Sequence, residues 1–207
     1  MADHVKPRGK IVRRLGVNIF GNPKYDRILQ RKPNPPGKAA HSYSRGRKRI
    51  SEYGKQLLEK QKIRYSYGLS ERQFRNTFFK AKRKSGIAGE NFIRLLESRV
   101  DNIVYRLGWA VSRAQARQMV NHGHIKVNGK SANIPSMMLK PGDLVTVREN
   151  TKLRKMVREQ IRHAAGNKVS WLKYDDDTQA GTFLDLPSMA SIEPAGDLQA
   201  VVEYYSR

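Results

Sequence analysis

Three residues that could bind a phosphate recur four positions apart: Arg113, Arg117 and Asn121. Residues four apart share one face of a helix, so a helix over 112–121 would present them together. An arginine in the first helical turn opposes the helix dipole at a cost of roughly 0.3–1 kcal/mol. Free backbone amides at the same helix start bind anions. This position therefore favours a bound phosphate, and an exposed arginine screened by solvent is the alternative.

Two other clusters could suggest metal chemistry. His122 and His124 flank a glycine, but the chain has no cysteine and offers no third ligand at a suitable spacing, so phosphate contact or a surface pocket is the better interpretation than zinc. The three aspartates at 175–177 could hold magnesium, although such runs are usually solvated loops. No phosphate-cradling glycine loop, nucleophile arrangement or acid pair is visible. We therefore expect no catalytic residue, no metal ligand and no cofactor.

Helices must position the first of these residues. Ser112 and Gln115 form a capping box that opens a short helix to about Asn121. Before it, apolar residues recur at three- and four-residue steps from Glu90 to Leu107, which predicts a helix with Gly108 at its C-cap. The two helices would meet across a tight turn.

Antiparallel strands follow these helices. Asn128-Gly129 is a strong hairpin signal between the strand 125–127 and Lys130. The segment 140–143, Lys-Pro-Gly-Asp, suits a type II turn that leads into a strand at 144–147. The short apolar stretches 171–172 and 182–184 could complete the sheet. The segment 201–205 could pack back as a final element.

Two more helices are expected earlier in the chain. Ser51 opens one that runs to about Gln61, and the residues 70–73, Ser-Glu-Arg-Gln, form a capping box that opens the next. Phe74 and Phe78 lie four apart and are best interpreted as core residues. Rings between basic residues could also stack on bases, and Tyr65 and Tyr67 remain open to either role.

The charge of the chain is strongly graded. Its 207 residues include 41 Lys and Arg against 18 Asp and Glu, for a net charge of +23. Residues 1–84 carry +19, residues 85–168 carry +9 and residues 169–207 carry −5. A polyanion should therefore meet the front two thirds of the chain. The chain shows neither a signal peptide nor 18 consecutive apolar residues, and its length is too short for a large catalytic domain, so we expect a soluble, non-enzymatic protein.

The first fifty residues read as a basic arm. Segment 6–14 has five basic residues in nine, and segment 32–49 mixes proline and glycine with lysine and arginine. Such a composition predicts a largely extended segment that is disordered until RNA binds it. A solvated linker is the alternative.

Longer motifs resemble a known family. The S4 RNA-binding module is matched by SRAQARQ at 112–118, HGHIKVNGK at 122–130 and KPGD at 140–143. This module also occurs in tyrosyl-tRNA synthetases and pseudouridine synthases. The flanking segments decide between them, because they resemble bacterial or organellar small-subunit ribosomal protein S4: EKQK at 59–62, YGLSERQF at 67–74, GEN at 89–91 and LLESRVDNIVYR at 95–106.

The resemblance implies a structural constituent of the small (30S) subunit, in cytoplasmic or organellar ribosomes. It implies a primary binder of 16S-type rRNA that acts at a junction of the 5′ domain and nucleates assembly of the body. It also implies contact with ribosomal protein S5 and other small-subunit proteins, an influence on translational accuracy, and a place near mRNA at its entry channel. Many relatives bind zinc through four cysteines in the arm, whereas Gly9 and Val12 stand about where the first two would be. The chain therefore resembles the metal-free type, and no membrane partner is expected.

We expect an α+β fold: a basic arm at 1–50, a helical domain at 51–90 joined by the C-terminal segment 188–207, and an S4-type domain at 91–187 with helices packed on a small antiparallel sheet. Its RNA-binding module would occupy about 97–158. The residues expected to contact RNA are Lys10, Arg13, Arg14, Arg45, Arg47, Lys48, Arg49, Lys55, Lys60, Lys62, Arg64, Arg72, Arg75, Lys80, Lys82, Arg83, Lys84, Ser112, Arg113, Arg117, Asn121, His122, His124, Lys126 and Lys130.

Two rival functions remain at this stage. An RNA-modifying enzyme could carry the same module, but it would need a separate sheet domain with a catalytic aspartate. A DNA-compacting protein would be separated by competition with duplex DNA. If Arg113 and Arg117 serve RNA alone, their replacement with alanine should weaken RNA binding and leave the thermal midpoint nearly unchanged.

Overall fold

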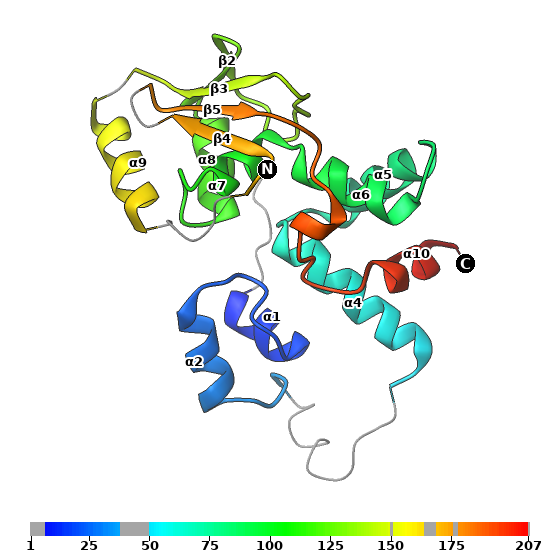
Figure 1. The fold of residues 1–207 in the computed structure, drawn as a ribbon. Helices are drawn as coiled ribbons and strands as arrows, with labels where there is room; N and C mark the ends of the chain where they lie inside the picture. Colours follow the sequence, from blue (N-terminus) through cyan, green and yellow to red (C-terminus); the bar gives the residue numbers. More distant parts are fainter. Residues whose placement is uncertain (1–6, 38–49, 150, 164–168, 176–177, 207) are drawn as a thin grey trace. The chain divides into compact units, whose positions relative to one another are not determined.

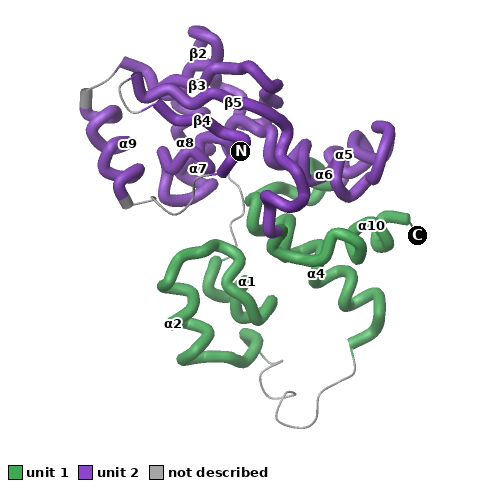
Figure 2. The backbone as a smooth tube through the Cα atoms, in the orientation of Figure 1, with its two compact units in different colours: residues 1–74, 194–207 green, residues 75–193 purple. Residues whose placement is uncertain are grey.

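The computed structural model describes residues 7–37, 50–149, 151–163, 169–175 and 178–206. It divides the chain into two compact units (Figure 2): unit 1 contains residues 1–74 and 194–207, and unit 2 contains residues 75–193. From the sequence, the boundary between the helical domain and the following α+β domain is expected at residue 90 instead. The described residues form helices and a five-stranded antiparallel sheet (Figure 1), which confirms the α+β class.

Two helices stand in the first fifty residues, where the sequence predicts a largely extended arm. Helix α1 spans Arg8–Leu15 and ends at Gly16, whose φ of 72° provides a left-handed C-cap. Helix α2 spans Pro23–Arg31, and the side chain of Asn22 caps it by accepting from the amide of Lys24. The expectation of an extended chain is therefore wrong for these segments, because their caps and their packing on each other stabilise helices. The remainder of the predicted arm, residues 38–49, lies outside the described residues.

Unit 1 is completed by a long helix and the end of the chain. Helix α4 spans Glu52–Ser66, with Ser51 as its predicted N-cap, and helix α10 spans Leu198–Ser206 and packs along it. Helix α5 spans Glu71–Lys82 and begins in this unit. Its predicted capping box is confirmed, since the amide of Gln73 donates to Ser70 Oγ at 3.3 Å and Gln73 Oε1 accepts from the amide of Ser70 at 3.5 Å.

A buried lysine joins these three helices. Lys60 on α4 is 3% exposed, and its Nζ lies 2.6 Å from Glu71 Oε1 on α5. The hydroxyl of Tyr205 on α10 donates to the same carboxylate oxygen at 3.0 Å, and the ammonium lies 4.7 Å from the ring of Tyr204. A buried ammonium is stable when a carboxylate and aromatic faces replace its water. This contact ties the C-terminal helix to unit 1.

Unit 2 begins with two helices where the sequence predicts one. Helix α6 spans Ala88–Glu97 and helix α7 spans Val100–Arg106, with Ser98 and Arg99 between them. The break has a non-local cause: the carbonyl of Ser98 accepts from the amide of Leu139 at 2.8 Å, and the amide of Val100 donates to the carbonyl of Met137 at 2.9 Å. The carbonyl of Ser98 and the amide of Val100 therefore form hydrogen bonds outside the helix, and one continuous helix cannot run through these residues.

Helix α8 spans Arg113–Asn121, and the sheet follows it. The strands are β1 at Ile125–Val127, β2 at Lys130–Ala132, β3 at Leu144–Val147, β4 at Leu172–Asp175 and β5 at Ala180–Phe183, in the order β2-β1-β3-β5-β4. Both predicted turns are confirmed. Asn128 and Gly129 have φ of 49° and 79°, as a type I′ hairpin requires, and Gly142 has φ of 93° where Asp143 donates to the carbonyl of Lys140.

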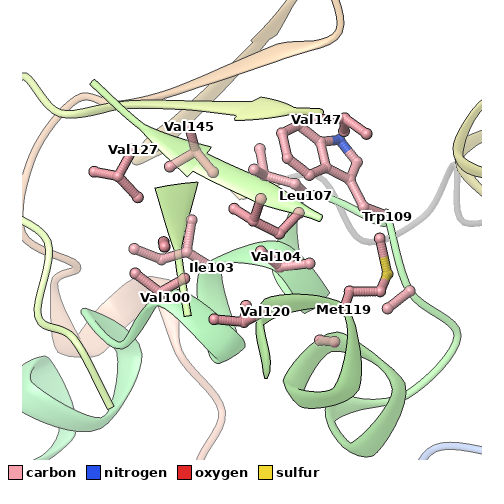
Figure 3. Close-up of a cluster of buried hydrophobic side chains, with 14 of the residues drawn as sticks. Val100, Ile103, Val104, Leu107, Trp109, Met119, Val120, Val127, Val145 and Val147 are labelled. Carbon is pink, nitrogen blue, oxygen red and sulfur yellow. The ribbon is translucent and has the colours of Figure 1, made fainter. Parts of the chain in front are cut away.

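The core of unit 2 lies between the sheet and helices α7 and α8 (Figure 3). Val104 and Val120 from the helices and Val145 from the sheet are fully buried, and Trp109 is 0% exposed beside them. Helix α9, at Thr151–His163, adds Leu153, Met156, Val157 and Ile161 to the same cluster. A 3-10 helix at Met189–Ser191 precedes the return of the chain to unit 1. The core thus holds α8 and the β1–β2 hairpin in fixed positions.

Replacing Glu71 with glutamine should make the free energy of unfolding less dependent on pH in the acid range. Burial alone would raise the pKa of Glu71, but Lys60, Tyr205 and Arg64 outweigh it, so the pKa lies below its ordinary value of 4.5. A lowered pKa contributes stability that is present above pH 4.5 and lost as the pH falls through the folded value. Glu71→Gln should therefore be less stable than wild type at pH 7, with the difference shrinking below pH 4.5.

Urea unfolding between pH 7 and pH 3 measures this difference. Glu52→Gln is the matched control, since Glu52 forms an exposed pair with Lys55 on α4. A stability gap between wild type and Glu71→Gln that stays constant with pH would contradict the assignment.

Candidate nucleic-acid interface

Two buried carboxylates lie beneath the arginines that the sequence singles out. Glu97, at the end of α6, is fully buried. Arg106 Nη2 lies 2.7 Å from its Oε1, Arg106 Nε donates to its Oε2 at 2.9 Å, and Asn102 Nδ2 donates to Oε2 at 2.6 Å. A buried carboxylate is tolerated when several charged or polar donors replace its water, as they do here.

The second carboxylate, Asp101, takes two arginines. Arg99 binds it in a bidentate arrangement, with Nε and Nη2 at 2.9 and 2.8 Å from the two oxygens. Arg117, on α8, places its Nε 3.0 Å and its Nη2 2.9 Å from Oδ2. The Arg117 side chain is 22% exposed, so part of it lies at the surface. This ion pair also connects α7 to α8.

Arg113 has an internal partner as well. Its Nε donates to Asn102 Oδ1 at 2.8 Å, its Nη2 lies 4.0 Å from Glu97 and its guanidinium stacks 4.6 Å from the centre of the Tyr105 ring. Ser112 caps the helix as predicted, with Oγ accepting from the amide of Gln115 at 3.3 Å. These contacts explain an arginine in the first turn without a phosphate. In contrast to the prediction from sequence, we therefore expect the removal of Arg113 and Arg117 to lower stability.

The remaining residues of the predicted module lie at or near the surface. Asn121, His122 and Lys130 are exposed, while His124 and Lys126 are half-buried. The rings of His122 and His124 lie 5.9 Å apart. Among the described residues, no group of three His, Asp or Glu side chains is placed to hold a metal. The structure thus brings this polar set together at the end of α8 and along the β1–β2 hairpin.

Helix α5 and the turn after it carry a second exposed set in unit 2. Arg75 stacks over the ring of Phe79 at 5.5 Å, and its head remains in solvent. The others, all exposed and within or just beyond the last helical turns, are Lys80, Lys82, Arg83 and Lys84. Cations near a helix C-terminus also stabilise the helix, so their position alone does not require RNA.

The predicted residues of unit 1 divide into exposed and engaged side chains. Lys10, Arg14 and Arg72 are exposed. Arg13 donates to the carbonyls of Lys32 and Asn34, which holds the chain after α2. The engaged side chains on α4 are Lys55 and Lys62, each paired with a glutamate three residues earlier, and Arg64, which donates to Gln61 and stacks on Tyr65.

Lys60 requires a correction. The sequence places it with the RNA-binding residues, but its ammonium is buried against Glu71 and the rings of α10. It acts in the packing of unit 1, and we remove it from the RNA-binding set. Four further predicted residues lie outside the described residues: Arg45, Arg47, Lys48 and Arg49.

Sequence analysis missed helix α9. Its apolar residues 153, 156, 157 and 161 recur at helical spacing, and basic residues stand between them. That pattern is a readable signal for an amphipathic helix with a basic outer face. The buried acids Glu97 and Asp101 were also missed, although they lie four apart beside the apolar residues of this segment.

Comparison with known proteins shows which family has this combination of a capped helix, a hairpin and basic flanking segments. Residues 98–145 match the S4 domain, and residues 4–97 match the ribosomal protein S4/S9 N-terminal domain. The small ribosomal subunit protein uS4 of Treponema denticola is 50% identical over 202 residues, covering 98% of this chain and 97% of that protein. The chain belongs to the uS4 family. The same protein of Treponema pallidum is also 50% identical, and that of Borrelia duttonii is 47% identical over 97% of this chain and 96% of its own.

Membership of the uS4 family makes the chain a structural ribosomal protein rather than an enzyme. The family match also confirms the resemblance read from the 59–74 and 95–130 motifs. In the part of the chain that the structure describes, no helix has the length and apolar character needed to cross a membrane.

Replacing Glu97 with glutamine should destabilise unit 2 by about 3 kcal/mol, because Arg106 and Arg113 lose a buried counter-charge. Guanidinium unfolding of the full chain measures the loss. Glu90→Gln, on the same helix, is the control: its pair with Arg94 is half-exposed and should contribute less than about 1 kcal/mol. Equal losses of unfolding free energy in the two variants would show that the buried ion pairs of Glu97 contribute no more than an exposed pair.

Proposed function

We propose that the chain binds small-subunit ribosomal RNA directly, as a primary binding protein, through the surface formed by α8 and the β1–β2 hairpin. The name of the relatives supports a place in the small subunit. The chemistry of the surface supports RNA as the ligand, since arginine, lysine, histidine and asparagine donors gather there on rigid elements. A structural protein of a ribonucleoprotein needs such a surface and no catalytic group.

The observation that carries this proposal is the fixed position of the arginines. Asp101 holds Arg117, and Asn102 and Tyr105 hold Arg113, while both side chains stay about one fifth exposed. A cation that is already oriented loses less conformational entropy when a phosphate binds. Lys126 and Lys130 on the hairpin add mobile point charges beside them.

Unit 1 and the basic segment 38–49 would bind further RNA. Lys10, Arg14 and Arg72 are exposed there, and the sequence adds the cations of 45–49. We propose that these groups and those of α5 neutralise phosphates around a multi-helix junction of the 5′ domain. Binding that draws several RNA helices together would nucleate assembly of the 30S body.

We propose a protein contact at an acidic groove of unit 1. A groove in unit 1 is lined by four carboxylates and one lysine: Glu52, Glu59 and Lys55 on α4, Asp197 just before α10, and Glu203 on α10. Such a groove repels RNA and suits a basic segment of a neighbouring subunit protein. We propose ribosomal protein S5 as this neighbour, with an influence on translational accuracy and a place near the mRNA entry channel, as the family resemblance implies.

Binding to a transcript of the 5′ domain of small-subunit rRNA should depend strongly on salt. If about six to ten phosphates are neutralised, affinity falls about 10³- to 10⁵-fold between 50 and 200 mM salt. Filter binding over this range measures the slope, and duplex DNA of equal length is the competitor. A nearly flat salt response, or equal competition by DNA, would overturn RNA capture by this surface.

Two double variants should distinguish cations that have internal partners from cations that lie at the surface. Lys126→Gln with Lys130→Gln should reduce the salt slope by about 2 and leave the thermal midpoint nearly unchanged, because these side chains lie at the hairpin surface. Arg113→Ala with Arg117→Ala should weaken binding and also lower the thermal midpoint, since Asp101 and Asn102 lose partners. An arginine pair that weakens binding at unchanged stability would contradict the internal role of these contacts.

A further inference from the structure

Helix α9 presents one face to the core and another to solvent. Val157 is fully buried, and Leu153, Met156 and Ile161 pack against the same cluster. Gln179, in the turn between β4 and β5, donates to the carbonyl of Arg154 at 3.1 Å and fixes the helix to the sheet. Figure 1 shows α9 in yellow at the side of the sheet. The direction of its outer face is therefore set by packing.

That outer face is a line of cations. Lys152, Lys155, Arg158 and Arg162 are exposed and follow one another at steps of three, three and four residues, so they share one helix face. We call this set the α9 basic stripe. At 1.5 Å per residue it extends over about 15 Å along the helix. Glu159, the one acidic residue of the helix, is also exposed and lies on this face, four residues after Lys155 and three before Arg162.

Three of the four cations in the stripe have no evident role in the described part of the fold. Among the described residues, Lys155, Arg158 and Arg162 form no ion pair, in contrast to Arg106, Arg113 and Arg117 over the buried acids. Like charges three or four residues apart on a helix cost about 0.2–0.5 kcal/mol per pair. Glu159 offsets part of this repulsion, and the stripe keeps a net positive charge that an external anion would neutralise.

We propose that the α9 basic stripe binds the sugar-phosphate backbone of an RNA segment, as a second contact beside the α8 and hairpin surface. The inference rests on the proposed function and extends it to residues that neither the motifs nor the family match single out. An evenly spaced line of lysine and arginine matches a polymer that carries a charge at every nucleotide. A membrane surface does not fit, because the apolar face that would enter it is already packed in the core.

The test compares three full-length proteins on a transcript of the 5′ domain of small-subunit rRNA. One is wild type, one carries Lys155→Gln, Arg158→Gln and Arg162→Gln, and the control carries Lys155→Arg, Arg158→Lys and Arg162→Lys. The glutamine variant should lose about 2 to 3 units of salt slope and bind about tenfold more weakly at about 100 mM salt. The charge-preserving control should match wild type, because backbone contact depends on charge rather than on bidentate geometry.

Hydroxyl-radical footprinting supplies an independent readout. The glutamine variant should lose protection at nucleotides different from those lost by Lys126→Gln with Lys130→Gln. Unchanged slope and footprint in the glutamine variant, with normal wild-type binding, would overturn the α9 contact and leave the proposed function standing. Wild-type protein that fails to bind the transcript would overturn the proposed function itself.

Discussion

The organisation of unit 2 depends on two carboxylates that are buried in a chain of net charge +23. Glu97 and Asp101 are 0% and 3% exposed, and between them they engage Arg99, Arg106 and Arg117. Removing an ion from water costs several kcal/mol, so a buried acid is stable only where its counter-ions sit at hydrogen-bonding distance. That requirement fixes where α7 and α8 lie and where the arginines point.

The basic residues of unit 2 therefore fall into two groups, according to whether a buried partner orients them. Arg113 and Arg117 are oriented by internal partners, and about one fifth of each side chain is exposed. Lys126 and Lys130 on the hairpin and Lys155 and Arg158 on α9 form no ion pair among the described residues, so these side chains can follow a phosphate as it moves. Oriented arginines favour a defined RNA geometry, whereas mobile lysines add long-range attraction that salt screens. The proposed rRNA contact would use both.

Sequence reasoning succeeded where the physics is local. The capping box at Ser70, the N-cap at Ser112 and the turns at 128–129 and 140–143 depend on residues within a few positions, and each stands in the structure. At Ser112 the return bond of the box is shifted by one residue, because Gln115 Oε1 accepts from the amide of Val111. It failed where distant groups decide. The break between α6 and α7 needs the backbone of Met137 and Leu139, and the burial of Lys60 needs Glu71 and the rings of α10.

The candidate site shows the same contrast between features that nearby residues decide and features that distant residues decide. The spacing of 113, 117 and 121 was enough to place three polar residues on one helix, but the acids beneath them come from preceding helices. A first-turn arginine looked like evidence for phosphate because Asn102 and Tyr105 could not be seen beside it in the sequence. Helix α9 is different, since its apolar and basic periodicity was present in the sequence from the start.

The claim that buried acids prepare the basic surface is tested most directly by the RNA affinity of Asp101→Asn. The variant is one unit more positive than wild type, so charge alone would make it bind rRNA more tightly. If Asp101 acts by holding Arg117, the variant binds the 5′-domain transcript more weakly at equal salt and at a temperature where circular dichroism shows both proteins folded. Affinity equal to or above that of wild type would contradict the account.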